Sequence, residues 1–223
     1  MVEERARQER SERTRAQIVE AAAAAFAEHG FDGISLNDVV KRSGLSKGAF
    51  YFHFSSKEEL AQSAFQVKQA QLLGMLAGGA ETPPASAAEA LADMWRRRNR
   101  LLAKDPSLAC VTRLGGELNT RSSPGSAFAS SHEAPIAMLA GLVRRGQEVG
   151  EFRSDLDAGA AARAIFAWVV GTDTLSMLST GGKDLEERSE EVLALLLAGL
   201  AAHGPVSSPR GRIKNRSNKE RAR

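Results

Sequence analysis

The chain alternates between stretches in which apolar residues recur every three or four positions and short stretches rich in glycine and proline. The first pattern is typical of amphipathic helices, and the second marks helix ends and loops. Residues 1–11 are predicted to form a mixed-charge arm. No strand pattern occurs, so we predict an all-α fold. Helices are expected at about residues 12–29, 36–43, 47–54, 57–72, 86–104, 106–119, 128–149, 156–178 and 184–202.

Residues 35–57 carry the most informative local pattern, two short helices that meet at a glycine. Ser35 is suited to cap the first helix, because serine accepts a backbone hydrogen bond there, and Asp38 holds the acidic position of a capping box. Gly44 is expected to end that helix, since glycine adopts the left-handed conformation without steric cost. Ser46 can cap the next helix. The short connection predicts a helix-turn-helix whose two helices cross steeply.

The second of these helices has the character of a recognition helix. Its N-terminal end carries a lysine and two small residues, which allow close approach to base edges in the major groove. Polar and cationic side chains further along can donate to phosphate oxygens. No carboxylate occurs between residues 39 and 57, so DNA would meet no repulsion from this stretch. The predicted DNA contacts are Ser35, Ser46, Lys47, Gly48, Ala49, Tyr51, His53 and Lys57.

A core hairpin with purely structural aromatics is the competing interpretation, but such a hairpin has no reason to exclude acids over so long a stretch. The run SLNDVVKRSGLSKGAFYFHFSSKEEL at residues 35–60 also closely resembles the DNA-binding domain of TetR-type repressors. It includes the K-G-x-x-Y-x-H-F core of their recognition helix. The resemblance implies a homodimer that binds palindromic double-stranded operator DNA. It also implies a C-terminal domain that binds a small molecule, whereupon the DNA is released.

Length and composition fit a globular protein. The chain has 223 residues, of which 43% are apolar, enough to bury a core. No apolar run is long enough to cross a membrane, and the charged N-terminus has no signal-like region, so we expect a cytoplasmic protein without a membrane partner. The single Cys110 cannot form an intramolecular disulfide. A buried thiol is expected there, with a redox-sensing thiolate as the alternative.

Composition and patterning together divide the chain into three parts. Residues 1–60 are predicted to form the DNA-binding domain, and residues 61–203 a larger helical domain for ligand binding and dimerisation. The formal net charge is +3, yet residues 204–223 hold seven lysines and arginines and one glutamate, so the rest of the chain carries −3. This basic tail is predicted to be disordered. It is either a solvated terminus or a contact to DNA phosphates without sequence preference.

No pattern in the chain indicates catalysis. The four histidines, His29, His53, His132 and His203, are spread over different elements and lack both zinc-site spacing and a cysteine pair. No G-x-G-x-x-G motif for a dinucleotide occurs. We therefore predict no catalytic residue, no metal site and no cofactor. An enzyme is the weakest of three interpretations, after a ligand-responsive repressor and a constitutive DNA-binding repressor without a natural ligand.

The last two predicted helices are apolar over wide faces. A helix that is apolar on more than one side must bury more than one side. The domain's own core explains part of this burial and a second subunit explains the rest. The resemblance agrees, since TetR-like proteins dimerise through their last two helices. The predicted dimer interface consists of Trp168, Val169, Leu196 and Leu200.

Large and soft side chains in the C-terminal domain could line an apolar cavity that holds a few polar groups. The predicted ligand-binding residues are Trp95, Phe128, Ser131, Trp168 and Thr172, although each of the large side chains also fits an ordinary core position. The segment 120–131 is expected to be mobile and to lie near the mouth of this cavity. The predicted effector is a small apolar molecule with a polar ring or a carboxyl group.

A finer resemblance concerns residues 46–61, 105–114 and 169–172. These segments are similar to the γ-butyrolactone autoregulator receptors of antibiotic-producing actinobacteria. Those receptors typically carry a tryptophan that stacks on the ligand, at the position where this chain has Ser131. The effector that the resemblance implies is thus a γ-butyrolactone-like signal or an antibiotic-related compound, and the departure at Ser131 leaves the choice open.

Overall fold

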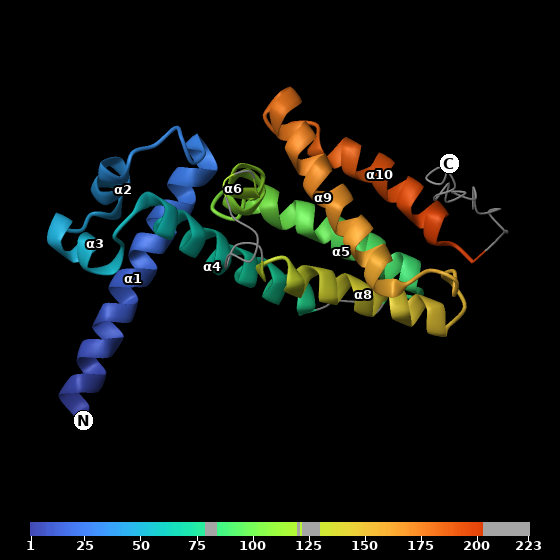
Figure 1. Ribbon diagram of the computed structural model, residues 1–223, viewed down its shortest axis with the longest axis horizontal. Coiled ribbons are helices and arrows are strands. Elements are labelled where there is room, and N and C mark those ends of the chain that lie inside the picture. Colours follow the sequence, from blue (N-terminus) through green and yellow to red (C-terminus); the bar gives the residue numbers. More distant parts are fainter. Residues whose placement is uncertain (79–83, 120, 122–129, 203–223) are drawn as a thin grey trace, which may run out of the picture.

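The computed structural model describes residues 1–78, 84–119, 121 and 130–202. Within these residues the chain is all-α, apart from one isolated antiparallel bridge between Phe152 and Ala201. Figure 1 shows a small N-terminal group of helices beside a larger bundle. The helices are α1 (Val2–His29), α2 (Leu36–Ser43), α3 (Lys47–His53), α4 (Lys57–Ala77), α5 (Ala87–Lys104), α6 (Cys110–Asn119), α8 (Glu133–Glu148), α9 (Ala158–Thr180) and α10 (Leu185–Leu200).

The first apolar core joins the N-terminal helices to part of the larger bundle. Phe26, Phe50 and Phe54 are buried between α1, α3 and the start of α4. The same core continues into α6 through Cys110 and Leu114. Apolar burial therefore does not stop at the boundary predicted near residue 60, and α6 packs directly on the DNA-binding module.

The second apolar core lies between α5, α8, α9 and α10. It is built around buried side chains that recur at helical spacing, among them Trp95, Leu139, Ile165 and Leu193. A bidentate ion pair between Arg96 and Glu190 ties α5 to α10 at the edge of this core, with contacts of 2.7 and 2.6 Å. Three of these helices, α5, α8 and α9, also contribute to the wall of the cavity described below.

Several helix boundaries differ from the sequence expectation, among them the start of α6 at Cys110 and the start of α8 at Glu133. The first helix starts at Val2, so residues 2–11 are helical and not an arm. Glutamates lie in its first turn, where they suit the helix dipole, and Gln8 donates to Glu12 one turn on at 3.1 Å. Its N-terminal half points away from the other helices in Figure 1. The helix α4 continues through Gly74 to Ala77 and is capped by Gly78, and Leu76 adds buried apolar surface in this last turn.

The described parts of the chain contain no helix with the length and apolar character that a membrane span requires.

Candidate DNA-binding surface and effector cavity

The helix-turn-helix is set by the local signals that the sequence contains. The Ser35 hydroxyl accepts from the Asp38 N–H at 3.2 Å and donates to the Asp38 carboxylate at 2.5 Å, which completes a capping box. Gly44 ends α2 with φ +69°. The Ser46 hydroxyl accepts from the Ala49 N–H at 3.2 Å and caps α3. Ser35 and Ser46, both predicted DNA contacts, thus already serve as helix caps.

The segment Gly44–Gly48 also has the spacing G-x-S-x-G, which marks the nucleophile of many hydrolases. In those enzymes the serine sits on a tight strand-to-helix turn. Here Ser46 lies between two helices and its hydroxyl is the N-cap of α3. The spacing therefore has a structural meaning and carries no catalytic one.

The helix α3 presents one polar face and one buried face. Lys47 and Gly48 are exposed and Tyr51 is 47% exposed, whereas Phe50 is fully buried. Sequence reasoning missed Phe52, which is 78% exposed on the open side of α3. The sequence contains a signal for this exposure. Phe50 and Phe54 are four residues apart and share the buried face, whereas Phe52 is two residues from each and lies on a different face. Ala49 and His53 are half-buried beside these groups.

The cations near α3 are less free than the sequence suggests. Arg42 pairs with Glu28 of α1 at 2.8 Å, and this hydrogen bond lowers the pKa of the Glu28 carboxyl. The Lys57 ammonium lies 4.5 Å from the centre of the Phe31 ring, a cation–π contact. Among the described residues no carboxylate pairs with Lys47. Lys47 is therefore the cation at this surface most available for an anionic partner.

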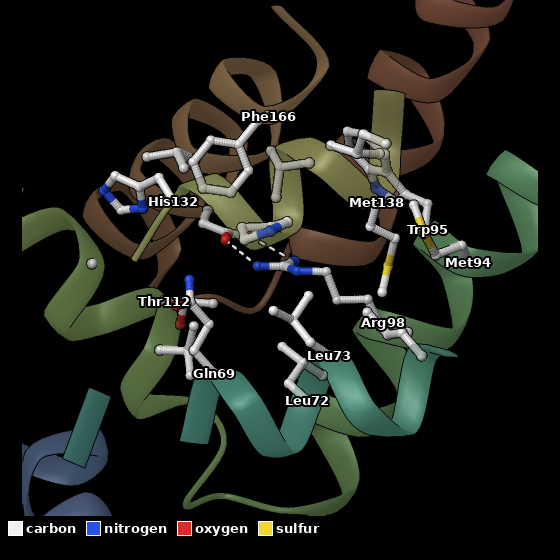
Figure 2. Close-up of a pocket in the computed structure, with 18 of the residues that line it drawn as sticks. Gln69, Leu72, Leu73, Met94, Trp95, Arg98, Thr112, His132, Met138 and Phe166 are labelled. Atoms are coloured by element: carbon white, nitrogen blue, oxygen red, sulfur yellow. Dashed lines mark hydrogen bonds and ion pairs between the residues drawn. The ribbon is translucent and has the colours of Figure 1, made fainter. Parts of the chain in front are cut away.

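A cavity of about 100 Å³ lies inside the larger bundle, enclosed by α4, α5, α6, α8 and α9. Most of its wall is apolar or aromatic, and Figure 2 shows many of these side chains converging from different helices. A small number of polar groups interrupts the apolar wall, as in many small-molecule sites. The lining consists of Phe65, Gln69, Leu72, Leu73, Leu76, Met94, Trp95, Arg98, Val111, Thr112, Gly115, Gly116, His132, Pro135, Met138, Leu139, Phe166, Val169, Val170 and Asp173.

An ion pair between α5 and α9 forms the most polar part of this wall. Arg98 Nη1 donates to Asp173 Oδ1 at 3.1 Å, and Arg98 Nη2 donates to Asp173 Oδ2. Both side chains are largely buried, and Arg98 Nη1 also donates to the Asn99 side chain at 3.2 Å. The dashed lines in Figure 2 mark the interaction of Arg98 inside the cavity. Sequence reasoning missed this pair, although Arg98 lies one turn after the core residue Trp95.

His132 closes one side of the cavity. Its ring packs against Phe65 and Phe166, with ring centres 6.5 and 5.3 Å apart. Burial lowers the pKa of the His132 imidazole, because the charged form loses hydration. The ring is accordingly neutral at pH 7.

Only one predicted ligand-binding residue, Trp95, lies in the lining of this cavity. Trp168 is 45% exposed on the outer side of α9, and the Thr172 hydroxyl donates to the Trp168 carbonyl at 2.7 Å, so neither faces the cavity. They were expected there as a large and a polar side chain of this helix, whereas the residues of α9 that line the cavity are Phe166, Val169, Val170 and Asp173. Ser131 is half-exposed outside the lining, and Phe128 lies outside the described residues.

The four predicted dimer residues lie in different environments. Leu196 is only 5% exposed and Leu200 is buried with it in the second core, while Val169 lines the cavity. In one chain Leu196 and Leu200 are thus already buried and Val169 is half-buried, so these three side chains offer little surface to a second subunit. Trp168 remains outside. The outward apolar residues of α9 and α10 are Trp168, Leu175, Leu178 and Leu195.

The chemistry of the other singled-out groups is structural. Cys110 is buried, and desolvation raises the pKa of its thiol to about 12. The thiolate required for redox sensing is therefore not formed at neutral pH. Across the residues that the structure describes, no cluster of histidine, cysteine and acidic side chains could hold a metal ion. The basic tail, residues 204–223, lies outside them.

The arrangement defines a helix-turn-helix DNA-binding protein. Residues 18–64 match the family described as bacterial regulatory proteins of the tetR family. The chain belongs to the TetR family of transcriptional regulators, and it is not an enzyme. It is 31% identical to the full-length native TylP, a TetR regulator from Streptomyces fradiae, whose crystal structure superimposes with a TM-score of 0.66 and coverage of 86% of this chain and 88% of that one.

Two further relatives match across most of the chain. The A-factor receptor protein of Streptomyces griseus is 28% identical over 212 residues, which cover 93% of this chain and 72% of the relative. The fatty acid metabolism regulator protein of Bacillus subtilis is 29% identical over 187 residues, 82% of this chain and 94% of the relative. Similarity of this extent includes the helices around the cavity as well as the DNA-binding module.

Proposed function

We propose that the protein is a homodimeric repressor that binds a palindromic operator and releases it when a small molecule occupies the cavity. The observation that carries this proposal is the double role of α4. Its first turns pack in the core of the DNA-binding module through Leu60, Ala64 and Phe65. Its later turns line the cavity through Gln69 and Leu72. A ligand in the cavity therefore contacts the helix that positions the recognition helix.

The effector that fits best is a small, mostly apolar molecule of the γ-butyrolactone-like or antibiotic-related kind. Similarity to the A-factor receptor protein and to TylP supports this class. Ser131 at the expected tryptophan position argues for an effector that differs from those of the γ-butyrolactone receptors. The cavity is smaller than a typical ligand site, so Met94 and Met138, whose side chains are flexible, would have to move.

The proposed dimer uses the outer apolar face of α9 and α10. This face carries Trp168, Leu175, Leu178 and Leu195, which are between 45% and 78% exposed in one chain. Exposed apolar surface that is contiguous is typical of a protein interface. A two-fold dimer would place two copies of α3 on one side, so the operator half-sites should lie about 34–36 Å, or a multiple of that, apart.

The DNA-binding proposal is tested by substitution on α3. Lys47→Ala should weaken specific operator binding by about 1–3 kcal/mol, because it removes a cation that meets a base edge or adjacent phosphate. Tyr51→Phe should weaken binding to all sequences about equally, since a phosphate contact carries no sequence information. Gel-shift titrations with operator and scrambled duplexes measure both effects. Unchanged operator affinity of Lys47→Ala would disprove this assignment of the recognition helix.

The ligand switch is tested by titrating the operator complex with γ-butyrolactones, butenolides, furans and antibiotics. A true effector should release the DNA and change the fluorescence of Trp95, which lies in the cavity wall. Coupling of about 1–3 kcal/mol would lower operator affinity roughly 5–150-fold, and operator DNA must weaken effector binding by the same factor. If neither signal responds, the alternative holds: a constitutive repressor whose C-terminal domain serves assembly.

A further inference from the structure

The charged groups that line the cavity cancel one another, and this bears on which ligands it accepts. Three lining residues are ionisable: Arg98, Asp173 and His132. Arg98 and Asp173 neutralise each other through two hydrogen bonds, and burial keeps His132 neutral at pH 7. A ligand that enters therefore meets apolar side chains and a compensated ion pair.

We infer that the Arg98–Asp173 pair makes the cavity selective for uncharged amphiphiles, such as lactones and esters, against free carboxylates of the same carbon skeleton. The inference rests on the proposed function, because it takes the cavity as the effector site. A carboxylate that approached Arg98 would have to compete with Asp173, and one of the two anions would be left buried without a partner. Burying an unpaired charge is far more costly than burying a neutral polar group.

A neutral ligand meets no such penalty and can still be oriented. A guanidinium has five N–H donors. The described residues accept three hydrogen bonds from Arg98, two at Asp173 and one at Asn99. The remaining donors can serve a carbonyl oxygen while the ion pair stays intact. Gln69 is buried in the same wall and offers both an amide donor and an amide acceptor.

The matched probes are γ-octalactone and 4-hydroxyoctanoate, its ring-opened form. They share one carbon skeleton, and ring opening replaces the neutral ester with a carboxylate and a free hydroxyl, so the change of their affinity ratio between variants reports the effect of charge. With the wild-type full-length protein at pH 7, we expect the lactone to bind at least about tenfold more tightly, measured by calorimetry and by tryptophan fluorescence. Equal or tighter binding of the hydroxy acid would overturn the inference and leave the proposed function intact.

The second part of the experiment uses Asp173→Asn, because this substitution leaves the Arg98 charge without its buried partner. The variant should reverse the preference, with the hydroxy acid now binding more tightly than the lactone. Asp155→Asn is the control, since it removes an equal charge from an exposed ion pair with Arg153. The control should keep the wild-type ratio, and an equal change in both variants would overturn the inference.

The wild-type ratio decides the question even if Asp173→Asn fails to fold. Arg98→Lys, which retains a cation beside Asp173, should then keep the preference for the lactone. If neither probe binds to any folded variant, the inference fails, and the titration of the operator complex with the wider panel of compounds decides the ligand-switch part of the proposed function separately. Operator binding without any effector would still separate that result from a failure of the DNA-binding proposal.

Discussion

At the scale of single residues, Asp184 is the carboxyl that the fold stabilises most clearly in its charged form. It lies at the turn between α9 and α10, where its carboxylate accepts from the Ser176 hydroxyl at 2.5 Å. It also accepts from the Arg188 guanidinium at 2.7 Å and the Thr180 hydroxyl at 2.8 Å. These hydrogen bonds, that of Ser176 first, lower the pKa of Asp184 to about 2.

The lowered pKa of Asp184 predicts an acid-dependent loss of stability. A carboxyl whose pKa is lower in the folded state stabilises the fold above its unfolded pKa, near 3.8, and this contribution is lost as the pH falls towards 2. Asp184→Asn should therefore lower the Tm at pH 7, and the difference from wild type should shrink between pH 4 and 2. Thermal melts followed by circular dichroism measure this. A difference that stays constant over that pH range would contradict the assignment.

Residue-level signals divide into those that act locally and those that need the whole fold. The caps Ser35 and Ser46 and the stop at Gly44 follow from neighbouring residues, so the sequence predicts them. The partner of Arg98 is 75 positions away, at Asp173, and no local pattern indicates that pairing. The burial of Leu196 within one chain was not apparent for a similar reason, because the sequence does not reveal which side of a wide apolar stripe meets the core.

At the scale of elements, α6 provides a second connection between the cavity and the DNA-binding module. One side of α6 lines the cavity through Thr112 and Gly116. Its other side contacts the end of α1: the Arg113 guanidinium donates to the Glu28 carbonyl at 3.0 Å, and the Glu117 carboxylate accepts from the Phe31 N–H at 2.5 Å. The sequence identified only the covalent route through α4, since α6 acts by packing across the chain.

The α1–α6 contact predicts an unusual sensitivity at Gly30. This residue has φ +74° and ψ 179°, a conformation that is essentially restricted to glycine. A Cβ atom there would also lie 2.6 Å from Glu117 Oε1 and 2.9 Å from Arg113 Nε. Gly30→Ala should therefore destabilise the protein by about 1–3 kcal/mol in urea unfolding.

The matched control for Gly30 is Gly74→Ala. Gly74 lies on the exposed side of α4, and no atom lies within 4 Å of a Cβ built there. Alanine is the better helix former, so this variant should gain up to about 1 kcal/mol. A loss of stability in Gly30→Ala and a gain in Gly74→Ala would support a tight contact between α1 and α6. A Gly30→Ala variant as stable as the wild type would show that this contact accommodates a side chain without cost.

The sequence predicts the presence of each helix better than it predicts where the helix begins and ends. Apolar periodicity identified each helix that the structure describes, because that periodicity reflects the buried face. The start of α1 at Val2 was missed, since residues 2–11 have no apolar face and are helical through local propensity and side-chain pairs. The sequence predicts that an apolar cavity exists but not which residues line it, because its wall combines residues from five helices.

At the scale of the whole molecule, the proposed dimer requires the outer face of α9 and α10 to hold two DNA-binding modules together. Leu195 and Leu196 are adjacent in the sequence, but successive residues of a helix face directions about 100° apart, and only Leu196 faces the core. Leu195 is 67% exposed, whereas Leu196 belongs to the second apolar core. The same substitution at the two positions therefore separates the proposed dimer interface from the core of one subunit.

Leu195→Glu should leave the protomer folded, because the new charge stays in water, but it should prevent dimerisation through this face. Leu196→Glu should instead destabilise the fold by about 3 kcal/mol or more, since it removes buried apolar volume and buries a charge. Sedimentation, thermal melts and operator gel shifts are measured together. We expect Leu195→Glu to sediment as a folded monomer with much weaker operator binding, because one module retains only half of the site. A Leu195→Glu protein that remains dimeric and binds the operator like the wild type would place the interface on a different surface.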